Sequence, residues 1–309
     1  MTRPKCSIII PTYNHGAYIG RAVQSALSQT YPEVEIVVID DGSTDDTEER
    51  LREYRDKIVY FKKANGGLGA ARNSGIEIST GQYLQFLDAD DSIEPEKLER
   101  QIEILENNKQ IALVYSDCRN TDLEGNKTAN ISYILKDDEN PLSVLTHRVL
   151  TSLNACLTRR EAVVAIGMFD ECRHAQEDWD YWIRLCLNGY RVKYSPGDYV
   201  HYDQTGSEMT SDPILMYKRT RHLLEKFIGD LRFQNLTNDF VAHQNLQLAT
   251  RAYNNGWWKR ARRHFIRAVL ANPGLVEPKH WRRIPESYLR QGHNVIRGRE
   301  NSEPPNLDE

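Results

Sequence analysis

The sequence predicts an α/β protein built on a mostly parallel sheet, with a helical part after it. Three observations support this fold class. Short β-rich segments alternate with helical patterns through the first half of the 309 residues. Several of the expected strands end in polar clusters, and ligands bind at that end of the strands in open parallel sheets. From Pro213 onward the pattern is helical and rich in basic residues.

The composition is that of an ordinary globular protein, with 39% hydrophobic and 27% charged residues. A net charge of −4 gives no reason to expect nucleic-acid binding. No segment approaches the roughly 20 apolar residues of a membrane span, and the N-terminal apolar run is too short for a secretion signal. The cysteines are scattered and contain no C-x-x-C pair, so we expect reduced thiols in a cytoplasmic protein. They are Cys6, Cys118, Cys156, Cys172 and Cys186.

Turn residues and apolar runs locate the elements in chain order. The expected strands are Cys6–Ile10, Glu35–Ile39, Ile58–Phe61, Gln82–Leu87 and Ile111–Ser116. Helices are expected at Ala17–Gln29, at Thr47–Tyr54 and after Pro95. A hairpin-like pair is expected around Val192 and Tyr199. We expect a catalytic domain at 1–205, a helical region at 206–298 and a disordered tail at 299–309.

The segment "FLDADDS" places Asp88 and Asp90 on the same side of an extended loop. Their oxygens could converge on a hard cation such as Mg²⁺ or Mn²⁺. An alternative is a solvated turn before the next helix, which a D-x-D pattern standing alone favours. A calcium EF-hand loop is excluded because Ile93 stands where that loop requires glycine.

Two further segments carry candidate chemistry. "ANGGLGAARNSG" is a glycine-rich loop entering a helix, whose amides and Arg72 could face an anion, or which could be a flexible turn with a solvated arginine. "EDWDYW" opens a helix with Glu177 and Asp178. A carboxylate there suits a general base, but acidic residues in a first helical turn also occur without function. His201 is a lone histidine after an expected strand.

Taken together, these segments resemble the family 2 glycosyltransferases of bacterial surface-polysaccharide type, whose Rossmann-like fold is the nucleotide-diphospho-sugar transferase type called GT-A. The resemblance covers roughly Lys5 to Asp203. Its matching segments are Ser7–Thr47, Asn65–Gly75, Gly81–Asp91 and Glu177–Trp182.

The resemblance implies a role for each matched residue. The implied nucleotide contacts are Pro11, Thr12, Tyr13, Asp40, Arg72 and Asp88. The implied metal ligands are Asp88 and Asp90, with His201 near the metal and the diphosphate. Asp178 is the implied catalytic base of an inverting transfer, and Glu177 is its neighbour.

The resemblance also implies a divalent metal, Mn²⁺ or Mg²⁺, and a nucleotide-sugar donor, most commonly a UDP-sugar. The acceptor would be a hydroxyl of a glycan or of a lipid-linked molecule. We find neither a Q-x-x-R-W motif nor membrane helices, so a single addition per visit is expected. Two alternatives stay open: a non-catalytic module that binds a sugar nucleotide or a partner protein, and a nucleotidyltransferase on a related fold.

The C-terminal third resembles one tetratricopeptide-type helical hairpin between Leu246 and Pro273. The segment Arg251–Arg299 holds twelve basic and two acidic residues, and it includes Trp257, Trp258 and Trp281. Such a surface could lie on anionic lipid headgroups as a peripheral contact at the inner face of the membrane. It could equally be a solvated basic face. The sequence leaves the oligomeric state open.

Overall fold

The computed structural model describes residues 3–121, 127–130, 132–136, 138–171, 176–203, 213–228, 230 and 236–276. Its contacts divide the chain into two compact units. The first comprises Met1–Pro141 and Val149–Glu208, and the second comprises Leu142–Arg148 and Met209–Glu309. Cys172, Trp281 and the tail predicted at 299–309 lie outside the described residues.

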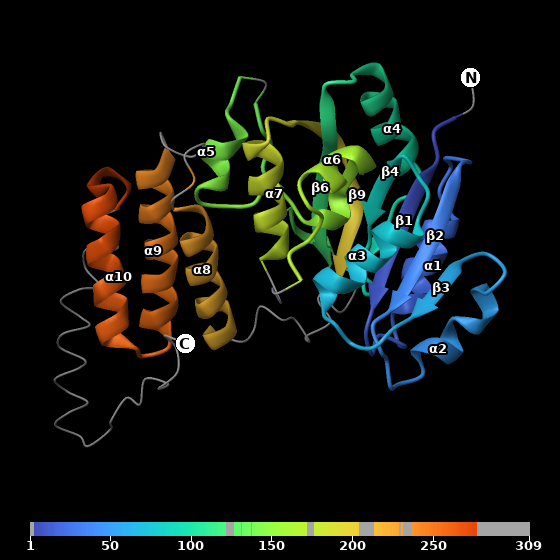
Figure 1. Ribbon diagram of the computed structural model, residues 1–309, viewed down its shortest axis with the longest axis horizontal. Helices are drawn as coiled ribbons and strands as arrows, with labels where there is room; N and C mark the ends of the chain where they lie inside the picture. Colours follow the sequence, from blue (N-terminus) through green and yellow to red (C-terminus); the bar gives the residue numbers. More distant parts are fainter. Residues whose placement is uncertain are drawn as a thin grey trace. The chain divides into compact units, whose positions relative to one another are not determined.

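Four parallel strands form one half of the sheet in the first unit (Figure 1). In spatial order they are β3 (Val59–Lys62), β2 (Val34–Asp40), β1 (Cys6–Thr12) and β4 (Tyr83–Phe86). All seven residues of β1 are buried, as expected for a central strand covered on both faces. The predicted α/β fold class is therefore confirmed, and the first four predicted strands are found within one or two residues of their expected bounds.

The other half of the sheet mixes directions. Strand β8 (Cys156–Arg159) is antiparallel to β4 and to β6 (Ile111–Thr121). Strand β9 (Arg191–Asp203) is parallel to β6, and β5 (Ser92–Ile93) is antiparallel to β9. Strand β7 (Lys127–Asn130) pairs with β6, which brings the sheet to nine strands within the described residues.

The prediction of a hairpin-like pair around Val192 and Tyr199 is wrong, because both residues belong to the single strand β9. The intervening Ser-Pro-Gly is a bulge and not a turn. Tyr115 of β6 is opposite Tyr194, whereas Asp117 is opposite Asp198, so β9 gains extra residues there while it keeps the same partner. Gly197 has a φ of 142° in this bulge.

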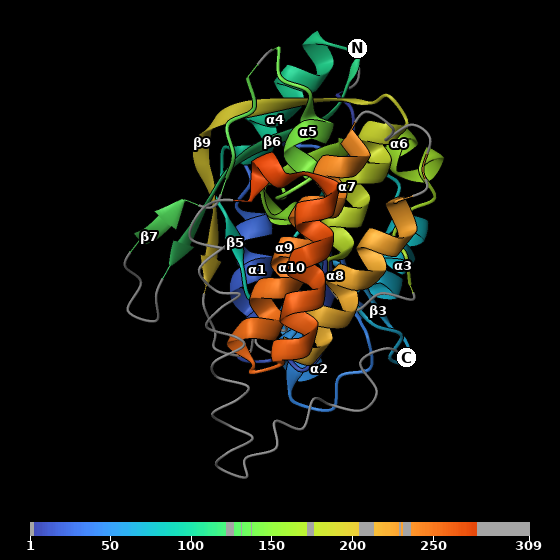
Figure 2. The same ribbon diagram turned by 90° about the vertical axis from the view of Figure 1, so that its left-hand side faces the viewer.

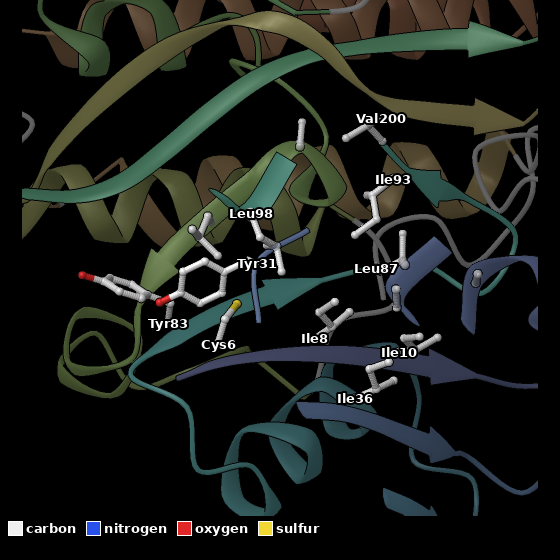
Figure 3. Close-up of a cluster of buried hydrophobic side chains, with 14 of the residues drawn as sticks. Cys6, Ile8, Ile10, Tyr31, Ile36, Tyr83, Leu87, Ile93, Leu98 and Val200 are labelled. Atoms are coloured by element: carbon white, nitrogen blue, oxygen red, sulfur yellow. The ribbon is translucent and has the colours of Figure 1, made fainter. Parts of the chain in front are cut away.

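Helices cover both faces of the parallel strands. Ile8 and Ile10 of β1 point to the face covered by α1 (Ile19–Leu27) and α4 (Lys97–Asn107), and their side chains join Leu98 of α4 in one core (Figure 3). The opposite face packs on α3 (Leu68–Ile78), whose Ala71 meets Val37 and Ile39 of β2. This alternation is what the two-residue period of a strand requires.

Gly75 allows α3 to lie close against the sheet. A Cβ atom at this position would approach Ile9 Cγ2 to 2.3 Å, well inside van der Waals contact. The close packing of α3 against the sheet therefore requires glycine at this position.

Three further helices belong to the first unit. They are α2 (Thr47–Arg50), α6 (Arg160–Ala165) and α7 (Glu177–Leu187). The helix predicted over 47–54 is interrupted after Arg50 and continues as a 3-10 turn at Arg52–Tyr54. In α7, Trp182 is fully buried and meets Tyr115 edge to face, so it belongs to the core as its helical spacing indicates.

The second unit is helical. Helix α9 (Thr237–Asn254) packs against α8 (Pro213–Phe227) and α10 (Trp258–Ala271), as both views show (Figure 2). In the short α5 (Pro141–Leu145), Pro141 belongs to the first unit and Leu142–Leu145 belong to the second. The predicted helical C-terminal region is thus present, and Phe265 and Ala268 are buried against α9. None of the helices in the described segments combines the length and apolar character needed to cross a bilayer.

Candidate functional site

The loops that follow β1 and β2 are locked together by reciprocal hydrogen bonds. The backbone N–H of Asn14 donates to Ser43 Oγ at 2.9 Å, and the N–H of Thr44 donates to Asn14 Oδ1 at 2.8 Å. Asn14 adopts a positive φ of 56°, which asparagine tolerates better than most residues. The two loops therefore form one ordered rim at the carboxyl ends of these strands.

The residues predicted to pack on a nucleotide base lie on this rim. Pro11 and Thr12 are buried, whereas the Tyr13 side chain is 46% exposed. Thr12 Oγ1 is buried and has no hydrogen-bond partner within the described residues. The exposed ring of Tyr13 can stack on a planar ligand, whereas the Thr12 hydroxyl has almost no exposed surface, so the predicted contact of Thr12 with a nucleotide stays a prediction.

Asp40 is fully buried at the end of β2. Its Oδ1 accepts the N–H of Ser43 at 2.7 Å, and its Oδ2 accepts the hydroxyl of Tyr60 at 2.7 Å. The carboxylate fixes the turn, so a contact with a nucleotide base would have to use its remaining lone pairs. Tyr60 was not among the predicted site residues.

Asp41 holds the glycine-rich loop, a role that the sequence did not reveal. Its carboxylate accepts the backbone N–H groups of Gly66 and Gly67 at 2.9 and 2.7 Å, and it pairs with Lys63. Gly67, with a φ of 89°, stands directly before α3. These two amides are therefore occupied by the chain's own carboxylate.

Arg72 joins the predicted metal loop to the predicted base. Its Nη2 donates to Asp88 Oδ1 at 3.0 Å, and its Nη1 lies 3.4 Å from both Glu177 Oε1 and Asp178 Oδ1. Asp88 is 16 residues away in the chain and Asp178 is 106. The fold thus brings three predicted carboxylates around one guanidinium.

Two members of this cluster, Arg72 and Glu177, are buried. Arg72 is 1% exposed and its guanidinium carbon lies 5.3 Å from the centre of the Phe169 ring. Arg72 Nε and Glu177 Oε2 are buried without a hydrogen-bond partner in the described part of the chain. Since the guanidinium has almost no exposed surface here, the predicted contact of Arg72 with a nucleotide stays a prediction.

Asn154 is a site residue that the sequence analysis missed. It is fully buried, its Oδ1 accepts the backbone N–H of Asp88 at 2.8 Å, and its Nδ2 donates to Asp88 Oδ2 at 3.1 Å and to Asp91. The only signal in the sequence is one amide within the apolar segment "SLNACL".

Asp90 is partly buried, and no other residue is found bonded to its carboxylate among the described residues. Burial and the neighbouring Asp88 charge raise the pKa of Asp90, and His15 acts in the opposite direction. A carboxylate whose charge is disfavoured in this way would be stabilised by a cation.

A cation site at this loop fits the oxygen donors that Mg²⁺ and Mn²⁺ prefer. Within the described residues, no three His, Cys, Asp or Glu side chains are grouped closely enough to hold a metal ion by themselves. Asp88 and Asp90 would therefore hold the ion together with oxygens supplied by a bound ligand.

His201 is near the loop in the backbone but its side chain meets another group. It lies opposite Ser92 in the pairing of β5 with β9, and its Nε2 is 2.5 Å from Glu94 Oε1. The predicted contact of His201 with a metal stays a prediction.

Asp178 has the pKa of a group suited to proton transfer near neutral pH. Burial raises the pKa of Asp178 to about 7, and the charges of Glu177 and Asp88 act in the same direction. Arg72 and a hydrogen bond from the Leu153 backbone act in the opposite direction. Its side chain is still 32% exposed, so a substrate can reach it.

Comparison with known sequences identifies relatives over most of the chain. The family described as "Glycosyl transferase family 2" matches residues 7–167. An uncharacterized glycosyltransferase of Rickettsia prowazekii is 31% identical over 80% of this chain and 84% of its own length. The chondroitin synthase of Escherichia coli is 39% identical over 41% of this chain, which is only 19% of that protein. The chain likewise spans only 33% of a glycosyltransferase of Rickettsia felis.

Solved structures share the fold at low sequence identity. TarS of S. aureus in complex with UDP-GlcNAc has a TM-score of 0.66 and 22% identity over 96% of this chain and 93% of that one. A mannosyltransferase of Pyrobaculum calidifontis in complex with GDP-Man and Mn²⁺ has a TM-score of 0.58 and 19% identity, covering 97% of this chain and 89% of that one. The GT-A type of fold is thereby confirmed, and from the family match the chain belongs to the family 2 glycosyltransferases.

Proposed function

We propose that this chain transfers a glycosyl group from a nucleotide-diphosphate sugar, in the first place a UDP-sugar, to a hydroxyl of a glycan or lipid-linked acceptor, with inversion. The observation that carries the proposal is the position of Arg72 between Asp88 and Asp178. This position supports the proposal because it brings Asp88, the proposed metal ligand, and Asp178, the proposed base, to the same guanidinium.

The chain's own residues would divide the work. The ring of Tyr13 would stack on the nucleotide base of the donor, and Thr12 would bond to that base. Asp88 and Asp90 would hold the divalent ion. The bound ion would neutralise charge on the departing diphosphate. Asp178 takes the proton from the acceptor hydroxyl, whose oxygen attacks from the face opposite the leaving group. No covalent enzyme nucleophile is needed in a single displacement.

The solved relatives support the class of donor. Structures of TarS are in complex with UDP and with UDP-GlcNAc, and that of the Pyrobaculum mannosyltransferase is in complex with GDP-Man and Mn²⁺. The first test is a thermal-shift and calorimetric panel of UDP-GlcNAc, UDP-glucose and GDP-mannose, each with and without Mn²⁺. We expect Mn²⁺-dependent binding of at least one UDP-sugar.

Donor hydrolysis separates this proposal from the alternatives. A glycosyltransferase should slowly hydrolyse its bound donor with Mn²⁺ and release UDP, and Asp90→Ala should abolish this. A non-catalytic module would bind the donor without turnover. A nucleotidyltransferase would release pyrophosphate from a nucleoside triphosphate. Either of the last two results would contradict the proposed function.

We also propose that α10 contacts an anionic membrane surface on the cytoplasmic side. Ile266 and Leu270 are 47% and 79% exposed on this helix. Three exposed cations share their face at helical spacing: Lys259, Arg263 and Arg267. Apolar tips between cations suit a headgroup region.

Liposome flotation tests this contact. We expect salt-sensitive binding to vesicles with anionic lipid, which the double variant Arg263→Glu, Arg267→Glu should lose while donor hydrolysis is retained. Absence of binding by the unmodified protein would contradict the membrane proposal and leave the proposed reaction intact.

A further inference from the structure

A short turn lies between the two halves of the candidate site. The 3-10 turn Leu153–Ala155 directly precedes β8, and its three residues are at most 1% exposed. Asn154 and Leu153 each contact a different group of site residues. The turn therefore connects elements that are far apart in the sequence.

On one side, the turn lies against carboxylates of the D-x-D loop and against the predicted base. The Asn154 amide bonds the backbone and the carboxylate of Asp88, and it also donates to Asp91. The backbone of Leu153 lies close enough to Asp178 to act against the rise in the pKa of that carboxyl. Asn154 thus bonds the D-x-D loop, while the adjacent Leu153 lies beside the predicted base, so one short turn is next to both.

On the other side, buried side chains donate hydrogen bonds to the backbone carbonyls of the turn. Gln85 Nε2 donates to the carbonyl of Asn154 at 2.8 Å, and Gln101 Nε2 donates to the carbonyl of Ala155 at 3.0 Å. The ammonium of Lys97 donates to the side-chain oxygens of both glutamines. Because Lys97 occupies both amide oxygens, the two NH₂ groups are left to face the turn.

This network is expensive to bury, which argues for a purpose beyond packing. Lys97, Gln85 and Gln101 are all fully buried, and no carboxylate is found bonded to Lys97 among the described residues. Burial lowers the pKa of Lys97 to about 7. An apolar side chain would fill the same space without this desolvation cost.

We propose that Asn154 is a positioning residue, which orients Asp88 for the divalent cation and holds that loop at a fixed separation from Asp178. The inference rests on the proposed function and extends it to a residue that contacts neither donor nor acceptor. Without the amide, Asp88 and Asp91 lose a shared donor, and their like charges are free to move the loop.

The test compares two variants of Asn154 with a matched control. Asn154→Ala removes all its side-chain hydrogen bonds. Asn154→Asp keeps the shape and the acceptor for the Asp88 N–H but adds a negative charge beside two carboxylates. The control is Asn245→Ala, a buried asparagine of α9 that bonds His264 and lies in the second unit.

Two quantities distinguish positioning from a merely structural role: the Mn²⁺ concentration for half-maximal donor hydrolysis at saturating donor, and Mn²⁺-dependent UDP binding by calorimetry. We expect Asn154→Ala to raise both constants about tenfold to a hundredfold, as for a lost hydrogen bond to a charged group, with a lower kcat. Asn154→Asp should be more severe, and Asn245→Ala should lower only the thermal midpoint.

Unchanged Mn²⁺ constants in either Asn154 variant would overturn the inference, and so would a fall in thermal midpoint alone. If Asn154→Ala does not fold, the Mn²⁺ constants of Asn154→Asp, whose side chain has the same volume as asparagine, decide the question. Failure of the unmodified protein to bind UDP with Mn²⁺ is a separate result, because it would contradict the proposed function itself and the inference with it.

Discussion

The two units of this protein each contain a buried polar cluster, and the two clusters are built on opposite principles. In the first unit, the buried Arg72 lies among Asp88, Glu177 and Asp178, so ionisable groups of opposite charge meet in one cluster. In the second, His264 of α10 lies between Tyr217 and Asn245, which are neutral.

The second cluster is closed. Asn245 Nδ2 donates to the carbonyl of Val241, so its Oδ1 accepts a hydrogen bond from the Nδ1–H of His264. His264 Nε2 in turn accepts a hydrogen bond from the hydroxyl of Tyr217. Burial, with nearby arginines, lowers the pKa of His264 to about 4. Every polar atom of the imidazole is used, and the ring stays uncharged at neutral pH.

The first cluster is open. Arg72 Nε and Glu177 Oε2 lack partners among the described residues, and Asp178 retains exposed surface. Three carboxylates share one guanidinium, so negative charge is in excess. The comparison indicates that a neutral cluster with all its hydrogen bonds formed serves to stabilise the fold. A charged cluster with unpaired atoms is suited to binding a cation and to transferring a proton.

Asp178→Asn should give the largest effect. The amide has the same shape but cannot accept a proton, so we expect kcat for transfer to fall about a hundredfold to ten-thousandfold. Donor affinity, measured by calorimetry with Mn²⁺, should change little. Equal losses of transfer and of donor binding would refute the assignment of Asp178 as the base.

Arg72→Met should strongly destabilise the first unit. The change leaves Asp88, Glu177 and Asp178 together without their cation, and breaking a buried ion pair from one side costs about 3–5 kcal/mol. Urea-induced unfolding measures the loss. The matched control is Arg50→Met, because Arg50 is 62% exposed in its pair with Asp46 and such pairs contribute about 1 kcal/mol or less. Similar effects of the two changes would contradict the central role of Arg72.

His264→Phe should affect stability alone. It removes the hydrogen bonds that His264 makes with the buried Tyr217 hydroxyl and with Asn245 Oδ1, and each lost buried hydrogen bond should cost about 1–3 kcal/mol. Donor hydrolysis and its Mn²⁺ dependence should be unchanged. His222→Phe on the exposed surface serves as the control, with an expected change within about 0.5 kcal/mol. If folded His264→Phe protein lost donor hydrolysis, the claim that the second cluster contributes only to stability would be wrong.

The smallest expected effect is the change of kcat/KM with pH, which also distinguishes the Asp178 cluster from the His264 cluster. The base acts in its deprotonated form, so activity should fall as pH drops below the raised pKa of Asp178, about 7 in the free protein. The expected fall is about tenfold per pH unit in the acid limb. His264, neutral through this range, should contribute nothing. A flat profile between about pH 5.5 and 8 would contradict this reading.

Local features of the sequence determined the fold class. The apolar runs of β1, β2 and β4 and the helical patterns between them specify a parallel α/β arrangement, since period and turn residues act over a few positions. The same local reasoning failed at Ser195–Gly197, because a bulge and a turn use the same residues and differ only in what their flanks pair with.

The sequence by itself also determined which residues are proposed to carry the chemistry, namely the acidic loop at Asp88–Asp90 and the acidic start of α7. Only the tertiary structure decided their partners: Arg72 for both groups, Asn154 for Asp88, and Glu94 for His201. These contacts span from 16 to 107 residues of chain. Periodicity cannot encode such distances, because they depend on how strands and helices pack once the core has formed.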